Sequence, residues 1–169
     1  YTVTYDQNGA TEFDGDTSKT VTYDTEYGTL PIVKREYTVE FDTKEGIECE
    51  PKQIEYTFDG WYLNESEVDK TSIVKTASDH KLTAKWTEQG IKLPETSKNG
   101  YEFIGWYTEE GIKVGEAGET YVPKENVKLI AHYEGKQYTL KVNPNGGKWR
   151  NKTEPQEIIG TIEEAIEKG

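Results

Sequence analysis

The residue types that most often carry chemistry are scarce in this sequence and lie far apart. The only histidines are His80 and His132, and the single cysteine, Cys49 in "GIECEP", has no histidine beside it. A zinc site needs several ligands at short spacings, and a catalytic nucleophile needs a base within hydrogen-bond reach. We therefore expect no catalytic residue, no metal site and no cofactor, and we interpret the chain as a non-enzyme.

The acidic segment 6–16, "DQNGATEFDGD", contains the oxygen ligands that calcium prefers. It begins like an EF-hand loop, but the pattern fails at the third ligand position and at the obligatory glycine. Two hypotheses are left open. We favour a polar hairpin loop, and the alternative is an irregular surface calcium site made by Asp6, Asp14 and Asp16.

A repeated aromatic segment is the most distinctive pattern in the chain: "YTFDGWYLN" at 56–64 returns as "YEFIGWYTE" at 101–109. In a regular strand, Phe58 and Trp61 would point to opposite faces. A bulge at the intervening glycine inserts one extra residue and brings both rings to one face. The pattern therefore predicts bulges at Gly60 and Gly105, with each tryptophan buried in a small core.

The same pattern has a functional interpretation, which we keep beside the structural one. If the rings following the bulge are exposed, they offer a flat aromatic surface on which a sugar or a peptide stacks. The candidate ligand contacts are then the two tyrosines that follow the tryptophans, Tyr62 and Tyr107.

Strands must position these residues, because apolar and polar side chains alternate through most of the chain. Three segments open alike, from Tyr1, Tyr37 and Tyr138, with the sequences "YTVTYDQNG", "YTVEFDTKEG" and "YTLKVNPNGG". Each has the period of two typical of a strand with one buried face, followed by turn residues. "KLTAKW" (81–86) and "KLIAHY" (128–133) are closing strands with the same alternation. Helix signals are scarce: 71–80 could hold one turn, and the stronger signal is in the tail, where Thr161 and Glu164 fit a capping box.

Charge excludes two classes of partner. The 169 residues include 32 acidic and 20 basic side chains, for a net charge of −12. Nucleic acids are bound largely through lysine and arginine on phosphates, and anionic membrane surfaces attract basic segments. No apolar run approaches the length of a spanning helix. We expect no nucleic acid partner, no membrane insertion by this segment, and a monomer in isolation.

The order of these motifs resembles the Listeria–Bacteroides repeat, which is similar to the B repeat of internalins. The resemblance rests on "YTVTYDQNG", "TVTYDTEYGTLP", "YTFDGWYLN" and "TSIVKTASDHKLTAKW" in residues 1–86, and on a reduced form in 87–133. It implies a small β-grasp-like repeat, in tandem, in a secreted or wall-anchored surface protein of Gram-positive type. It implies a stalk or adhesive role and carries over no catalytic residue.

We therefore predict a β-rich (α+β) chain of tandem β-grasp-like modules, with antiparallel or mixed sheets and little helix. Residues 1–86 are predicted as the first module with an inserted hairpin near 36–55, 87–133 as a shorter second module, and 134–169 as a partial third. The expected function is a stalk or spacer at the bacterial cell surface with adhesive contacts. The alternative is a specific binding module for a glycan or a host or cell-surface protein.

Overall fold

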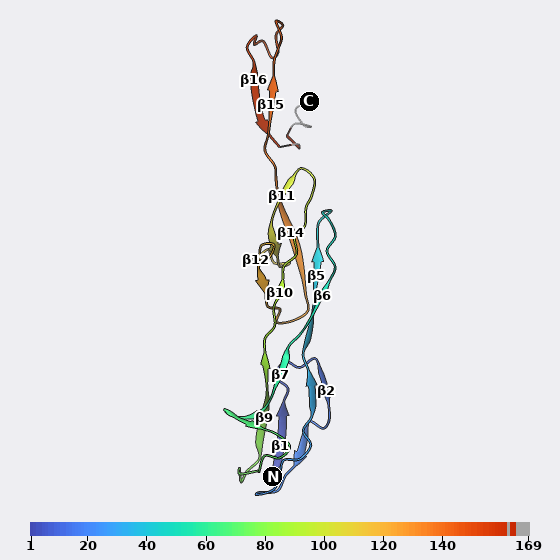
Figure 1. The fold of residues 1–169 in the computed structure, drawn as a ribbon, viewed down its shortest axis with the longest axis vertical. Helices are drawn as coiled ribbons and strands as arrows, with labels where there is room; N and C mark the ends of the chain where they lie inside the picture. The colour runs from blue at the N-terminus through green and yellow to red at the C-terminus, as the bar shows by residue number, and fades with distance from the viewer. Residues whose placement is uncertain (162, 165–169) are drawn as a thin grey trace. The chain divides into compact units, whose positions relative to one another are not determined.

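The computed structural model describes residues 1–161 and 163–164, and its regular secondary structure consists almost entirely of strands (Figure 1). Its β-rich character and its mixed sheets confirm the coarse fold prediction. The strands of the first two thirds are β1 Thr2–Asp6, β2 Glu12–Asp14, β3 Ser18–Thr20, β4 Ile32–Lys34, β5 Glu36–Asp42, β6 Lys52–Glu55, β7 Thr57–Leu63, β8 Ser66–Val68, β9 His80–Thr87 and β10 Ile91–Lys92. The remaining strands are β11 Tyr101–Tyr107, β12 Lys113–Gly115, β13 Thr120–Tyr121, β14 Val127–Gly135, β15 Tyr138–Val142 and β16 Gln156–Gly160.

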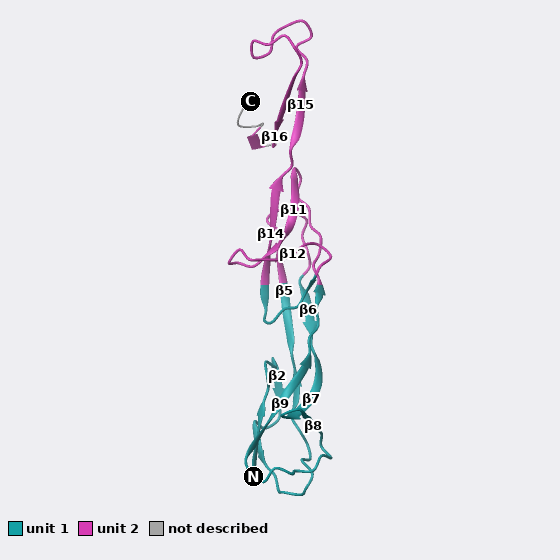
Figure 2. Cartoon of the chain, turned by 90° about the vertical axis from the view of Figure 1, so that its left-hand side faces the viewer, with its two compact units in different colours: residues 1–39, 51–91, 120–127 teal, residues 40–50, 92–119, 128–169 magenta. Residues whose placement is uncertain are grey.

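The chain forms two compact units, and neither is continuous in sequence (Figure 2). Unit 1 consists of residues 1–39, 51–91 and 120–127. Unit 2 consists of residues 40–50, 92–119 and 128–169. Strand β5 therefore begins in unit 1 and ends in unit 2.

Unit 1 is organised around a five-stranded sheet in the order β3-β1-β9-β7-β8. Its opening strand β1 and its closing strand β9 are parallel neighbours, with Tyr5 opposite Leu82, and the other pairings are antiparallel. The buried faces of these strands meet in one core, which also includes Val21, Tyr27, Val33 and Val74 from the connecting segments. The alternation of apolar and polar residues seen in sequence thus corresponds to a buried and a solvated face.

Both predicted bulges are present. The pairing of β7 with β9 shifts between Phe58 and Gly60, and that of β11 with β14 shifts between Phe103 and Gly105. Both glycines have φ 133°, a conformation that side chains other than glycine rarely adopt. Phe58 and Trp61 consequently contact each other edge to face, with ring centroids 5.9 Å apart. The prediction of a parity change at the glycine is confirmed.

Unit 2 repeats the tryptophan contacts of unit 1. Phe103 lies 5.4 Å from Trp106, and Trp106 is fully buried. Its indole N–H donates to the carbonyl of Pro94 at 2.8 Å, as the indole of Trp61 donates to that of Pro31 at 3.0 Å. Both prolines follow a leucine in the sequence, in Leu30-Pro31 and Leu93-Pro94, and each provides the acceptor for a buried indole.

The opening strand of this second core is β5, from the segment predicted as an inserted hairpin of the first module. Phe41, near the end of β5, packs against Trp106 with centroids 4.8 Å apart, just as Tyr5 of β1 packs against Trp61 at 5.1 Å. The sheet order is β12-β11-β14-β5-β6. The second core thus has an opening strand. Residues 40–42 at the end of β5 belong to unit 2, although they precede the closing strand β9 of unit 1 in the sequence. How the chain divides into folding modules stays a prediction that hydrogen exchange can test.

The predicted capping box is present at the start of the tail. The Thr161 amide donates to the Glu164 carboxylate at 3.1 Å, and the Glu164 amide donates to the Thr161 hydroxyl at 3.3 Å. Residues 163–164 are helical. The rest of the predicted tail helix lies outside the described residues.

Candidate functional site

Tyr62 and Tyr107, the candidate ligand contacts, occupy corresponding positions in the two units. Each directly follows a buried tryptophan, so each side chain points away from the core, and both are half-buried. The ammonium of Lys85 lies 4.2 Å from the centroid of the Tyr62 ring. Tyr107 instead stacks on the His132 imidazole, at 3.9 Å and 17°. Since Lys85 pairs with Gly60 and His132 with Gly105, these neighbours are equivalent too.

This arrangement covers one face of each tyrosine ring, and both tyrosines are half-buried. A cation over an aromatic ring is a favourable pair that keeps both groups in place. The Lys85 ammonium also bonds Glu65 at 3.2 Å, which further fixes its position. A ligand would therefore meet an amphipathic tyrosine beside a charge, a combination that suits hydroxyl-rich or peptide surfaces.

His80 has a structural environment. Its Nδ1 lies 2.8 Å from the Ser78 carbonyl, which can only accept, so this nitrogen carries the proton. Its Nε2 then accepts from the hydroxyl of Tyr27 at 2.7 Å. The Tyr27 ring is itself buried in the core of unit 1. Both ring nitrogens of His80 thus have protein partners.

The acidic loop does not gather its three aspartates. Asp6 pairs with Lys81 at 2.9 Å and accepts from the Asn8 amide at 3.0 Å, and both interactions hold the pKa of its carboxyl below the usual value. Asp14 and Asp16 instead line a recess of about 450 Å³ with Lys19. Among the described residues, no group of three or more His, Cys, Asp or Glu side chains is placed to hold a metal ion.

Tyr5 also lines this recess, but its hydroxyl is buried and has no hydrogen-bond partner among the described residues. Burial raises the pKa of Tyr5 to about 12, with a further contribution from Tyr27. The sequence pattern identified Tyr5 as a buried position but could not show that its hydroxyl would be unpaired.

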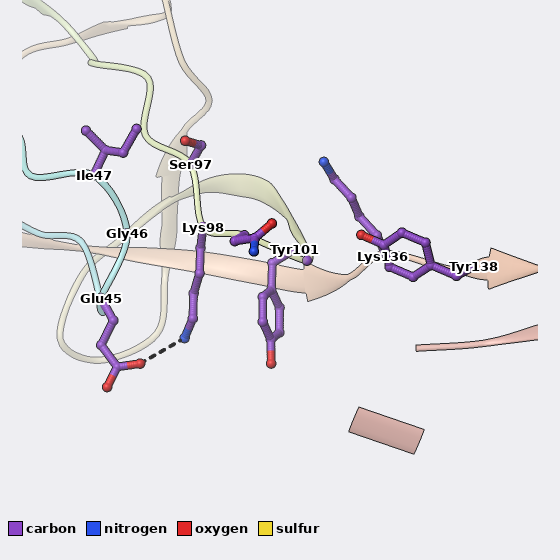
Figure 3. Close-up of a pocket in the computed structure, with 10 residues that line it drawn as sticks. Glu45, Gly46, Ile47, Ser97, Lys98, Tyr101, Lys136 and Tyr138 are labelled. Carbon is purple, nitrogen blue, oxygen red and sulfur yellow. Dashed lines mark hydrogen bonds and ion pairs between the residues drawn. The ribbon is translucent and has the colours of Figure 1, made fainter. Parts of the chain in front are cut away.

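A second recess, of about 590 Å³, lies in unit 2 and was not predicted from sequence (Figure 3). Lys98 lies beside the Tyr101 ring, with its ammonium 4.9 Å from the centroid, and pairs with Glu45 at 3.2 Å. Figure 3 shows Lys136 and Tyr138 at the opposite end of this recess. Since the Lys98 charge is already paired, the recess is a mixed polar and aromatic hollow and not a concentrated anion site.

One comparison with known proteins identifies the family. The model of the Listeria–Bacteroides repeat domain matches residues 1–85 and 87–132. A protein of Evansella cellulosilytica named "Putative membrane protein" is 27% identical over 123 residues, covering 57% of this chain and 18% of that relative. This chain therefore spans less than a fifth of the relative's length. No solved structure matches the chain significantly. Within the described residues, no helix has the length and apolar character needed to span a membrane.

Proposed function

This chain belongs to the Listeria–Bacteroides repeat family, and from that premise we propose that it is a stalk or spacer segment of a bacterial surface protein. The family is typical of bacterial surface and extracellular proteins and is generally a non-catalytic structural module. We place the segment outside the cell, in a secreted or wall-anchored protein of Gram-positive type. Adhesive contacts with a glycan or a host or cell-surface protein belong to the same proposal.

The observation that carries the proposal is the duplication of one core. Both units use the same bulge, the same tryptophan and the same proline carbonyl as acceptor. Repetition of a unit that is stabilised by its own core extends a chain without requiring new chemistry. The groups best placed for acid–base work, His80 and Asp6, are engaged in structural hydrogen bonds.

Each unit is further proposed to be β-grasp-like. In unit 1 the opening and closing strands lie at the centre of the sheet as parallel neighbours, and the intervening hairpin of β7 and β8 completes one side. This strand order supports the proposal. The expectation that the isolated segment is a monomer is part of it and is open to sedimentation.

Surface display would test the stalk function. The 169-residue chain is placed between a cell-surface anchor and an epitope, and antibody access to the epitope is compared with an anchor alone and with an unrelated repeat spacer of similar length. A stalk should raise access as the unrelated spacer does. Access no better than that of the anchor alone would contradict the proposal.

A second candidate function, specific binding of a glycan or protein, is favoured by the matched tyrosines. Tyr62 and Tyr107 occupy equivalent outward positions, each supported by a neighbour from the closing strand. If they bind a ligand, displayed cells should adhere saturably to a glycan or protein array, and the Tyr62→Ser/Tyr107→Ser variant should lose that adhesion. Tyr23→Ser is the matched control, because Tyr23 is exposed elsewhere in unit 1 beside Lys75.

A further inference from the structure

Strand β15 ends in the same kind of turn as β1 and β5, the opening strands of the two cores. Strands β1, β5 and β15 each end in the same turn, in which an Asp or Asn side chain accepts from the backbone amide two residues on. The acceptors are Asp6, Asp42 and Asn143, at 3.0, 3.1 and 3.0 Å, and the donors Asn8, Lys44 and Asn145 have φ of 45°, 47° and 46°. Such turns fix where a strand ends, so β15 is a third opening strand.

In both complete cores, the apolar face of the opening strand is covered by a closing hairpin. Here a closing hairpin means the bulged Phe-x-Gly-Trp-Tyr strand and the Leu-x-Ala-x-aromatic strand paired with it, β7 with β9 and β11 with β14. The closing strand β9 adds to the edge of β1 in parallel. The tryptophan then packs on the aromatic residue of the opening strand, Trp61 on Tyr5 and Trp106 on Phe41.

Strand β15 has no such cover from the part of the chain that the structure describes. Among the described residues it pairs only with β16, where Leu140 lies opposite Ile158. Leu140 is 60% exposed, whereas Val3 and Val39 at the equivalent positions are fully buried. An apolar face next to an unpaired strand edge is the arrangement that accepts an added strand.

We propose that β15 is a docking edge for the closing hairpin of a further copy of the repeat. The two cores define this occupant, because in both of them the closing strand lies next to the opening strand and the tryptophan of the closing hairpin packs on it. The printed sequence contains the Gly-Trp-Tyr pattern twice, and both copies are already engaged, on Tyr5 and on Phe41. Unit 2 also shows that an opening strand and its closing hairpin need not be consecutive in sequence, since β6 to β10 lie between β5 and β11.

The docking edge does not depend on the stalk function, because it follows from strand pairing alone. The closing strand is expected to add to β15 in parallel, with its leucine near Val142, as Leu82 lies opposite Tyr5. Its tryptophan would then cover Leu140 and Val142, whose side chains lie on the same face of β15 as that of Tyr138.

The test uses the whole chain and a synthetic peptide of residues 101–133, which contains one complete closing hairpin. We expect saturable one-to-one binding and slowed amide exchange at 138–142, with exchange at 2–6 and 36–42 unchanged. Leu140→Asp should weaken binding about tenfold or more, because the docked leucine is buried. Thr139→Asp is the matched control, since it adds the same charge on the opposite face, and it should change affinity by less than about twofold.

Two further measurements keep the proposal falsifiable if an aspartate disturbs the hairpin. Contacts between Tyr138 and Gly160 by NMR report whether β15 and β16 remain paired, and Leu140→Thr removes the apolar group while retaining a good strand former. Leu140→Thr should also weaken binding. The Trp106→Ala peptide should bind more weakly than the parent peptide.

Several results would overturn the docking edge. They are absence of saturable binding, binding unaffected by both Leu140 variants, and protection that appears at 2–6 or 36–42, which would mean exchange with the existing closing strands. Self-association of the chain through 138–142 without peptide would also overturn it, since the occupant would then be another β15.

Discussion

Among single residues, the aromatic side chain of the opening strand that contacts the buried tryptophan differs between the two cores. Tyr5 and Phe41 occupy the same place against a buried tryptophan, and they differ by one hydroxyl. The Tyr5 hydroxyl is buried without a partner among the described residues. A buried polar group that makes no hydrogen bond loses its hydration without compensation.

Tyr5→Phe should therefore stabilise unit 1, by about 1 kcal/mol. The change copies the residue that the second core already uses. Urea unfolding followed by tryptophan fluorescence measures it. Tyr27→Phe is the control, because the Tyr27 hydroxyl bonds His80 at 2.7 Å, and its removal should destabilise. If the two variants lose similar stability, the Tyr5 hydroxyl has a partner in solution.

Alkaline pH should weaken the protein partly through Tyr5. Its pKa rises to about 12 in the fold because burial favours the neutral phenol, against about 10 for an unfolded tyrosine. This preference stabilises the fold fully below pH 10 and is lost as the pH rises from about 10 to about 12. Between pH 10 and pH 12, the free energy of unfolding of the Tyr5→Phe variant should therefore rise relative to that of the parent, by up to about 2–3 kcal/mol. Parallel unfolding curves with constant difference would contradict the assignment.

Among the structural elements, the two bulges can be compared directly, because Gly60 and Gly105 have the same φ but different neighbours. A Cβ on Gly105 would lie 2.8 Å from the backbone oxygen of Gly115, whereas one on Gly60 would lie 3.1 Å from the end of the Glu67 side chain. A flexible carboxylate can move, but a carbonyl held in a sheet cannot do so without disturbing its neighbours.

Gly105→Ala should therefore cost more than Gly60→Ala, about 1–3 kcal/mol for backbone strain at Gly60 and at least about 1 kcal/mol more at Gly105. Gly111→Ala isolates strain of a positive φ alone, since nothing lies within 4 Å of the added carbon. Thermal unfolding of the three variants gives the order. Equal costs at Gly60 and Gly105 would show that the β11–β12 pair adapts.

Sequence alone could predict the bulges, because the conflict of parity between Phe58 and Trp61 is local. It also singled out Tyr62 and Tyr107 as candidate ligand contacts, which stays a prediction. It could not provide the neighbours that cover their rings, Lys85 and His132, because those depend on the register between distant strands. For the same reason, alternation identified β5 as a strand but not the core that it joins. The shared opening pattern of Tyr1 and Tyr37 was the available signal.

At the scale of the molecule, the interleaved order of segments makes a specific prediction about unfolding. Trp61→Ala removes the centre of the first core and should cost about 3–5 kcal/mol there. Hydrogen exchange should become fast at 2–6, 57–63 and 80–87. Residues 40–42 should stay protected with 103–107, because Phe41 packs on Trp106.

The division into modules 1–86 and 87–133 predicts instead that 40–42 lose protection with the rest of the first module. The matched variant Trp106→Ala should give the converse pattern, with 40–42 becoming fast and 2–6 staying slow. Equal loss of protection in both cores would mean that the chain unfolds as one cooperative domain and that neither division describes it.

Because the segments of the two units alternate along the sequence, the chain should respond to proteolytic cleavage differently from two consecutive modules. The backbone passes between the units at 39–40, 50–51, 91–92, 119–120 and 127–128. Cleavage at 91–92 would leave residues 40–50 of unit 2 on one fragment and residues 120–127 of unit 1 on the other. Each fragment would retain a part of the other's unit, and β5 would still lie next to β14 of the other fragment. We therefore expect a molecule cut at 91–92 to stay together, whereas two modules continuous in sequence would separate at a cut between them.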